Sequence, residues 1–141
     1  MGDRGNVIFT TNEGSFGYYS HWNGSRLPEL VAEILSENPS VAGRLDVDLE
    51  YGYRGVVHGL LLKEFPQGVE ETGAGLYPGR VLPDGTLELE FNADGSIWCQ
   101  EADYTVAQFI DRYHPNNKSA RIAELQATIE QAQAELKALG A

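Results

Sequence analysis

The feature that most constrains the fold is a change of periodicity within Ser15–Pro28 (SFGYYSHWNGSRLP). Up to Trp22 the side chains alternate between two faces, as they do in a β-strand. Beyond Pro28 the apolar residues recur at helical spacing, and Asn23-Gly24 between the two patterns is a turn signal. A chain that passes from strand to helix within so few residues indicates a fold in which sheet and helix pack together.

The remaining patterns extend this mixture of strands and helices along the chain. Turn signals at Asp84-Gly85 and Asp94-Gly95 predict that the last three predicted strands form a meander. We therefore expect an α+β fold in which an antiparallel sheet of about five strands is packed with helices. The predicted strands are Asn6–Asn12, Ser15–Trp22, Gly73–Leu82, Thr86–Phe91 and Ser96–Glu101. The predicted helices run from Pro28 to Asn38-Pro39, over Asp46–Phe65 and from Asp103 or Thr105 to Tyr113, although a strand over Leu45–Val57 is an alternative to the second helix.

The C-terminal segment has a different composition, rich in Ala, Glu, Gln and Leu, which predicts a helix over Ser119–Leu139. Its apolar residues fit a heptad repeat, and we expect this coiled-coil-like helix to mediate oligomerisation. The alternative is that the same stripe packs on the chain's own sheet. The predicted domains are a globular α+β domain over residues 1–117, ending in a linker at 114–117, and a C-terminal helix over residues 118–141. The heptad a positions are Ile122, Ile129 and Leu136, and the d positions are Leu125, Ala132 and Leu139.

The net charge of −11 falls entirely on residues 1–117, because three basic and three acidic residues balance in the tail. Direct binding of nucleic acid needs clustered Lys and Arg and is not expected. No apolar run is long enough to span a membrane, and no signal peptide is recognised, so we expect a cytoplasmic protein. Cys99 is the only cysteine, which predicts a small buried thiol, and no cofactor or metal site is expected.

The strand–helix corner is the candidate binding site, because free backbone N–H groups and a positive helix end are expected there. A small anionic or nucleotide-like ligand would suit these donors. The alternative is that His21 and Trp22 seal the corner while Ser25 caps the helix. The candidate ligand-binding residues are Arg4, His21, Trp22, Asn23, Gly24, Ser25 and Arg26.

Two short stretches carry a resemblance to a known family. The opening Met1–Asn6 (MGDRGN), followed by Tyr19–Gly24 (YSHWNG) and Leu27-Pro28, resembles small uncharacterised proteins of phages and prophages that begin MGDRAN. The resemblance implies a viral setting, the host cytoplasm, and a role for Asp3 and Arg4 beside His21. Gly5 in place of Ala and the tail from Lys118 depart from the family pattern.

Four functions follow as hypotheses. The first is a non-enzymatic, phage-type binding protein with a role against host defence that holds a small anionic or nucleotide-like ligand at the corner. The second is an acidic inhibitor or nucleic-acid mimic that docks on a basic host protein. The third is an enzyme with His21 as general base, oriented by Asp3, and the fourth is a purely structural oligomer.

Overall fold

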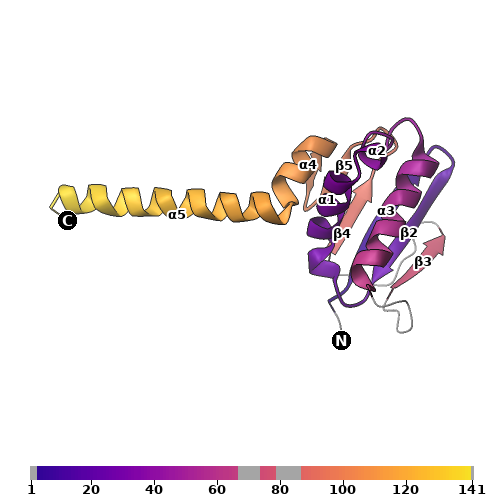
Figure 1. Cartoon of the computed structure of the whole chain (residues 1–141), viewed down its shortest axis with the longest axis horizontal. Helices are drawn as coiled ribbons and strands as arrows, with labels where there is room; N and C mark the ends of the chain where they lie inside the picture. Colours follow the sequence, from indigo (N-terminus) through magenta and orange to yellow (C-terminus); the bar gives the residue numbers. More distant parts are fainter. Residues whose placement is uncertain (1–2, 67–73, 79–86, 141) are drawn as a thin grey trace.

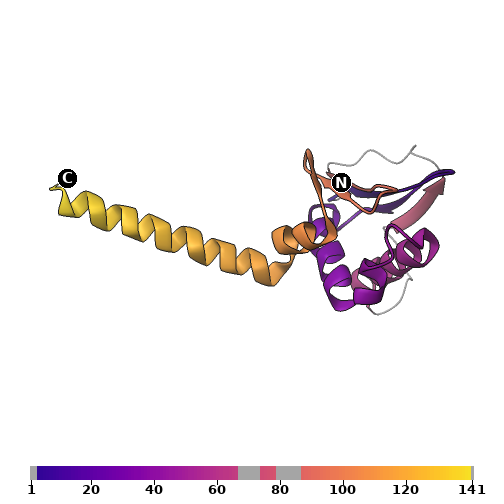
Figure 2. The ribbon, with the colours of Figure 1, turned by 90° about the horizontal axis from the view of Figure 1, so that it is seen from above.

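The computed structural model describes residues 3–66, 74–78 and 87–140 of the 141-residue chain. Within these residues, one six-stranded sheet forms a layer, and helices α1, α3 and α4 cover one of its faces, while α5 projects away (Figure 1). The view from above shows the same helices on one side of the strands (Figure 2). The predicted α+β class is therefore confirmed.

The sheet is mixed, which corrects the prediction of a purely antiparallel sheet of about five strands. Its order is β3-β2-β1-β4-β5-β6, and the β1–β4 pair is parallel while every other pair is antiparallel. The strands are β1 (Gly5–Thr11), β2 (Gly14–Ser20), β3 (Ala74–Pro78), β4 (Leu87–Phe91), β5 (Ile97–Cys99) and β6 (Ala102–Tyr104).

The predicted meander is only partly right. The β4–β5 hairpin forms as expected, but β3 pairs with β2, so that β2 and β1 lie between β3 and β4. The two strands expected to form a hairpin through Asp84-Gly85 are therefore not neighbours, and that turn lies outside the described residues. The pairing of β4 with β1 is a long-range contact that no local turn signal encodes.

Strand β6 was not predicted. The turn before it places Gln100 and Glu101 at φ 49° and 69°, a left-handed conformation that usually belongs to glycine or asparagine. The usual residue signal for a tight turn was therefore missing from the sequence, and the prediction ended with β5.

The core lies between the helices and the inward face of the sheet. Phe9 stacks on Phe16 and Phe91 with ring centroids 4.8 and 5.2 Å apart, and Tyr53 of α3 leans on all three rings. The Tyr53 hydroxyl donates to the Thr10 carbonyl at 2.7 Å, so that it finds a partner at the end of the sheet. These contacts fix α3 over β1, β2 and β4.

Helix α1 (Leu27–Glu37) ends before Asn38-Pro39 as predicted, and the expected connector contains the short helix α2 (Pro39–Ala42). Helix α3 (Leu49–Glu64) begins three residues later than predicted, where Asp48 accepts a hydrogen bond from the Tyr51 amide. Its glycines allow close packing, because a Cβ at Gly59 would lie 2.8 Å from Ile34 Cγ1 of α1. The helix interpretation is thus correct.

Helix α4 (Val106–Tyr113) starts with a capping box formed by Thr105 and Gln108. The predicted linker is absent, since α5 (Pro115–Ala138) starts at Pro115 and only His114 separates it from α4. Pro115 suits a first helical position because its missing N–H costs nothing there. His114 Nδ1 accepts a hydrogen bond from the Asn116 amide at 3.2 Å, so its side chain caps the start of α5.

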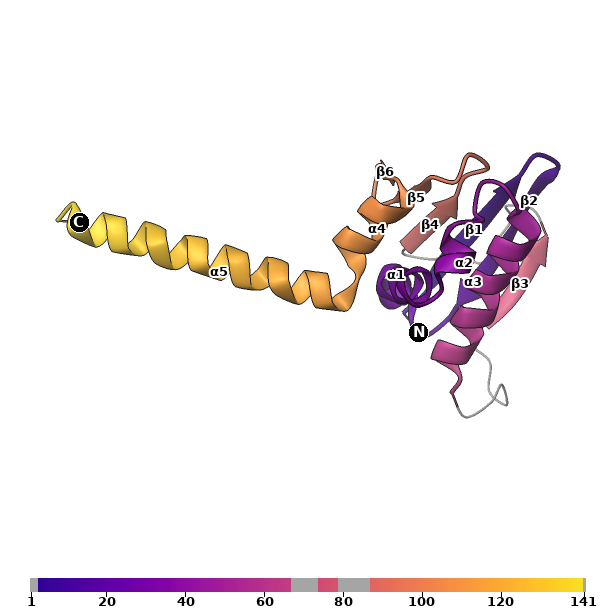
Figure 3. The ribbon, with the colours of Figure 1, turned by 45° about the horizontal axis from the view of Figure 1, so that its top comes forward.

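Helix α5 extends into solvent (Figure 3). Its apolar side chains Leu125, Ile129 and Leu136 are 48%, 56% and 57% exposed. These values contradict the alternative in which the stripe packs on the chain's own sheet.

Candidate functional site

The strand–helix corner forms where predicted, and polar side chains converge on it. Strand β2 ends at Ser20, a 3₁₀ turn covers Gly24–Arg26, and α1 starts at Leu27. The groups that satisfy the corner, however, come from the chain itself: Asp3 before β1 and Glu64 at the end of α3.

Asp3 is a built-in anion at the start of the helical segment. Its Oδ1 accepts a hydrogen bond from the Ser25 amide at 2.9 Å, and its Oδ2 accepts one from the Ser25 hydroxyl. Its carbonyl oxygen accepts from the Gly24 amide at 2.6 Å. Two of the backbone donors that we assigned to a ligand therefore bind Asp3.

Gly24 is needed for a contact between backbones. A Cβ at Gly24 would overlap the carbonyl group of Arg4, and a Cβ at Gly5 would lie 2.7 Å from Gly24 Cα. The two glycines let the entry to β1 lie directly on the corner. This packing brings the Arg4 backbone to the corner, beside Gly24.

Glu64 holds the other side of the corner, and the sequence analysis missed it. Its carboxylate accepts hydrogen bonds from the hydroxyls of Tyr18 and Ser20 and from Asn23 Nδ2, the last at 3.1 Å. Burial, then the hydrogen bond to Glu64 and its charge, raise the pKa of Tyr18 far above its usual range. One signal was available, because a carboxylate in the last turn of a helix opposes the helix dipole and needs a compensating partner.

His21 and Trp22 form an aromatic pair at the rim. His21 Nδ1 lies 2.6 Å from the Tyr19 hydroxyl, and the His21 and Trp22 rings meet edge to face at 4.5 Å. Trp22 is 59% exposed, so the indole does not seal the corner as the packing alternative required. Because Asp3 binds Ser25 and His21 meets Tyr19, the described hydrogen bonds do not include the Asp3–His21 pairing of the general-base hypothesis.

The corner thus presents side chains to solvent. Ser25 and Arg26 are exposed beside Trp22, while the amides of Gly24 and Ser25 are in use. An incoming anion would have to displace the Asp3 carboxylate or bind Arg26 and Trp22 from outside.

A second candidate surface lies on the outward face of the sheet, opposite the helices. Ile8, Glu90, Trp98 and Asp103 follow one another across β1, β4, β5 and β6 in register. Ile8 is buried, Glu90 and Trp98 are half-buried, and Asp103 is exposed. Glu88 is also exposed on this face, two residues before Glu90 on β4. We call Glu88, Glu90, Trp98 and Asp103 the acidic sheet face.

No positive charge offsets the acidic sheet face from within the described strands, which contain no Lys or Arg. Glu90 accepts a hydrogen bond from the Thr10 hydroxyl at 2.9 Å, and Asp103 accepts one from Asn92 Nδ2 at 3.3 Å. Glu88 and Asp103 therefore offer exposed carboxylates on either side of the half-buried Trp98.

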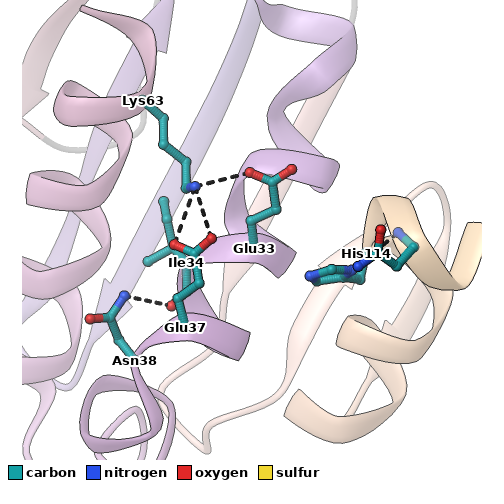
Figure 4. Close-up of polar contacts among 7 residues, drawn as sticks. Glu33, Ile34, Glu37, Asn38, Lys63 and His114 are labelled. Carbon is teal, nitrogen blue, oxygen red and sulfur yellow. Dashed lines mark hydrogen bonds and ion pairs between the residues drawn. The ribbon is translucent and has the colours of Figure 1, made fainter. Parts of the chain in front are cut away.

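Two grooves lie along α3. One, of about 490 Å³, runs between α1, α2 and α3, and Lys63 at its end binds Glu33 and Glu37 of α1 at 2.9 and 3.3 Å (Figure 4). Burial lowers the pKa of Lys63, but hydrogen bonds to the two carboxylates and their charge raise it more, and the net shift is upward. These two ion pairs link α1 to α3, and the Lys63 ammonium group is already paired.

The other groove, of about 680 Å³, lies between α3 and the β2–β3 side of the sheet, where Phe16, Val57, Leu61 and Leu76 line it. Leu76 is 61% exposed, so the groove is open. Its lining is mainly apolar, and nothing in the described residues identifies an occupant.

The remaining predictions from the sequence concern Cys99, metal binding and membrane-spanning segments. Cys99 is buried, and burial raises the pKa of its thiol. The described residues contain no cluster of three or more His, Cys, Asp or Glu placed to hold a metal ion. Within the same residues, none of the helices combines the length and apolar character that crossing a bilayer requires.

Comparisons with known proteins found no match among protein-family models, curated proteins or solved structures.

Proposed function

We propose that the chain is a non-enzymatic binding protein that docks through its acidic sheet face on a basic protein partner. The observation that carries this proposal is the set of carboxylates around Trp98 on strands that contain no Lys or Arg. Carboxylates around an aromatic ring suit Lys and Arg side chains, which pair with the acids and stack on the indole.

The net charge supports the same partner class. Eighteen Asp and Glu against seven Lys and Arg over residues 1–117 steer a basic surface towards the domain over long range. The resemblance to phage and prophage proteins suggests the setting: a host protein in the cytoplasm that uses its basic surface to bind nucleic acid. Carboxylates in place of phosphates would block that surface, which is how a counter-defence protein could act.

The proposal is tested with nona-arginine as a cationic probe, measured by calorimetry. Glu88→Gln combined with Asp103→Asn should weaken binding about two- to thirtyfold, because two exposed ion pairs of about 0.2–1 kcal/mol each are lost. The matched control is Asp111→Asn combined with Glu130→Gln, which changes the net charge equally at exposed positions on α4 and α5. Equal loss in both double variants would mean that only net charge matters and would contradict a specific face.

The same titration should depend on salt. Ion pairs at an exposed surface are screened over a Debye length of about 8 Å at physiological ionic strength. Binding that is unchanged between low and high salt would also contradict the proposal.

The second candidate function is retention of a small anionic or nucleotide-like ligand at the corner. The observation that favours it is the exposure of both Trp22 and Arg26 at this corner, which offers an aromatic ring and a cation four residues apart in the chain. Titration with ATP should then change the Trp22 indole signal, and Arg26→Ala should abolish that change. No response to ATP or inorganic phosphate would remove this candidate.

We further propose that the chain self-associates through residues 119–139. The exposed apolar stripe of α5 supports this proposal. Exposure of Leu125, Ile129 and Leu136 to water is unfavourable, and a partner helix would bury these side chains. Sedimentation equilibrium tests it, and a monomer at all concentrations would contradict it.

A further inference from the structure

The exposed stripe of α5 allows its pairing direction to be inferred, which deepens the proposed self-association and rests on it. Helix α5 contains 24 residues and is therefore about 36 Å long. Its stripe needs an apolar partner, and a second copy of the same helix supplies one of matched length. Two directions are available, and two features of the chain distinguish them.

The first feature is the size of the residues at the middle of the stripe. Reversing one helix brings a positions opposite d positions, so that Ile129 faces Ala132 of the second copy in both central layers. Parallel pairing would face Ala132 with Ala132 and leave a poorly filled layer. Pairing large with small residues fills the space evenly, which favours the antiparallel direction.

The second feature is the charge of the domains. Residues 118–141 are neutral, so each copy carries its −11 in the domain at the start of α5. A parallel pair would bring the two acidic domains together. An antiparallel pair separates them by the length of the helix, about 36 Å, which exceeds the Debye length of about 8 Å several times.

We propose that two copies of the chain pair their α5 helices antiparallel, which places the two globular domains at opposite ends of a rod. Each end then presents one acidic sheet face. The dimer engages two basic sites that lie apart on one partner or on two partners, and the second contact benefits from a high effective concentration.

A charge substitution tests the direction, with the dimer dissociation constant measured by sedimentation equilibrium. In the antiparallel register residue 128 lies nearest Glu135 of the second copy, so Thr128→Lys should form two new ion pairs in the symmetric dimer and tighten it about two- to tenfold. Thr128→Lys combined with Glu135→Gln should not tighten it. A parallel dimer would show no tightening with Thr128→Lys alone, because residue 128 then faces Gln133, and that result would overturn the proposal.

Disulfide trapping reads the direction independently. In the antiparallel register residue 125 lies opposite residue 136 of the second copy, so a mixture of Leu125→Cys and Leu136→Cys chains should form the mixed disulfide dimer. Leu125→Cys alone should not form a dimer, and Cys99 is buried and does not interfere. A rapid disulfide in Leu125→Cys alone shows a parallel dimer, which overturns the direction but retains self-association. A chain that stays monomeric overturns both.

Discussion

Glu64 offers the sharpest test of how the corner is held. Replacing it with Ala removes the acceptor for the hydroxyls of Tyr18 and Ser20 and for the side-chain amide of Asn23. Tyr18 is 1% exposed and Ser20 is fully buried, so neither hydroxyl can turn to bulk water. A buried donor without a partner costs about 1–3 kcal/mol. For two buried donors and one half-buried donor we expect a loss of about 3–4 kcal/mol in the free energy of unfolding.

The assay is equilibrium urea unfolding at pH 7, followed by far-UV circular dichroism. Glu64→Gln keeps one acceptor oxygen and the side-chain shape, so it should cost less, about 1–2 kcal/mol. Glu130→Ala removes an exposed carboxylate on α5 and serves as the control, with a change below about 0.5 kcal/mol. If Glu64→Ala costs no more than this control, the carboxylate does not hold the corner and the reasoning is refuted.

Three further predictions concern packing and pH. Gly24→Ala should destabilise the domain by more than about 2 kcal/mol in the same assay, because the new methyl group overlaps the Arg4 carbonyl; a neutral result would show that the corner backbone is free to move. Gly59→Ala should also destabilise the domain, by about 1–2 kcal/mol, because the new methyl group crowds Ile34 and this cost exceeds the gain in helix propensity of about 1 kcal/mol. Combining Gly59→Ala with Ile34→Val should recover part of the lost stability. No recovery would contradict a direct contact between the two residues. Burial raises the pKa of Tyr53 to about 12. The unfolded chain loses this proton near pH 10, so the stabilisation present below pH 10 is lost as pH rises towards 12. Tyr53→Phe should reduce the fall of the urea midpoint between pH 10 and pH 12. The same fall in the variant and the wild type would contradict the prediction.

The helices were predictable because their signals are local. The apolar spacing after Pro28 and the Asp48 cap define α1 and α3 from a few neighbouring residues. The parallel β1–β4 pair was not predictable, because it joins segments about 80 residues apart and depends on which edges the other strands leave open. The start of α5 was missed because residues 114–117 were interpreted as a linker, although the proline at 115 also suits the first helical turn.

The candidate site, like the fold, was predictable only where its signals are local. The convergence of polar groups near Gly24 follows from the local strand-to-turn pattern, and the structure confirms it. Which groups satisfy those donors does not follow, because Asp3 and Glu64 reach the corner only through tertiary packing. The acidic sheet face was not predicted as a site either, since the position of Trp98 between Glu90 and Asp103 requires the register of β4, β5 and β6.

The most direct test of the proposed function uses the two indole N–H signals of the chain in a heteronuclear NMR titration with nona-arginine. The chain has two tryptophans, Trp98 on the acidic sheet face and Trp22 at the corner, so each surface has its own reporter. We predict that the Trp98 signal shifts progressively while the Trp22 signal stays in place. A shift of Trp22 with Trp98 unchanged would contradict the assignment of the acidic sheet face as the docking surface.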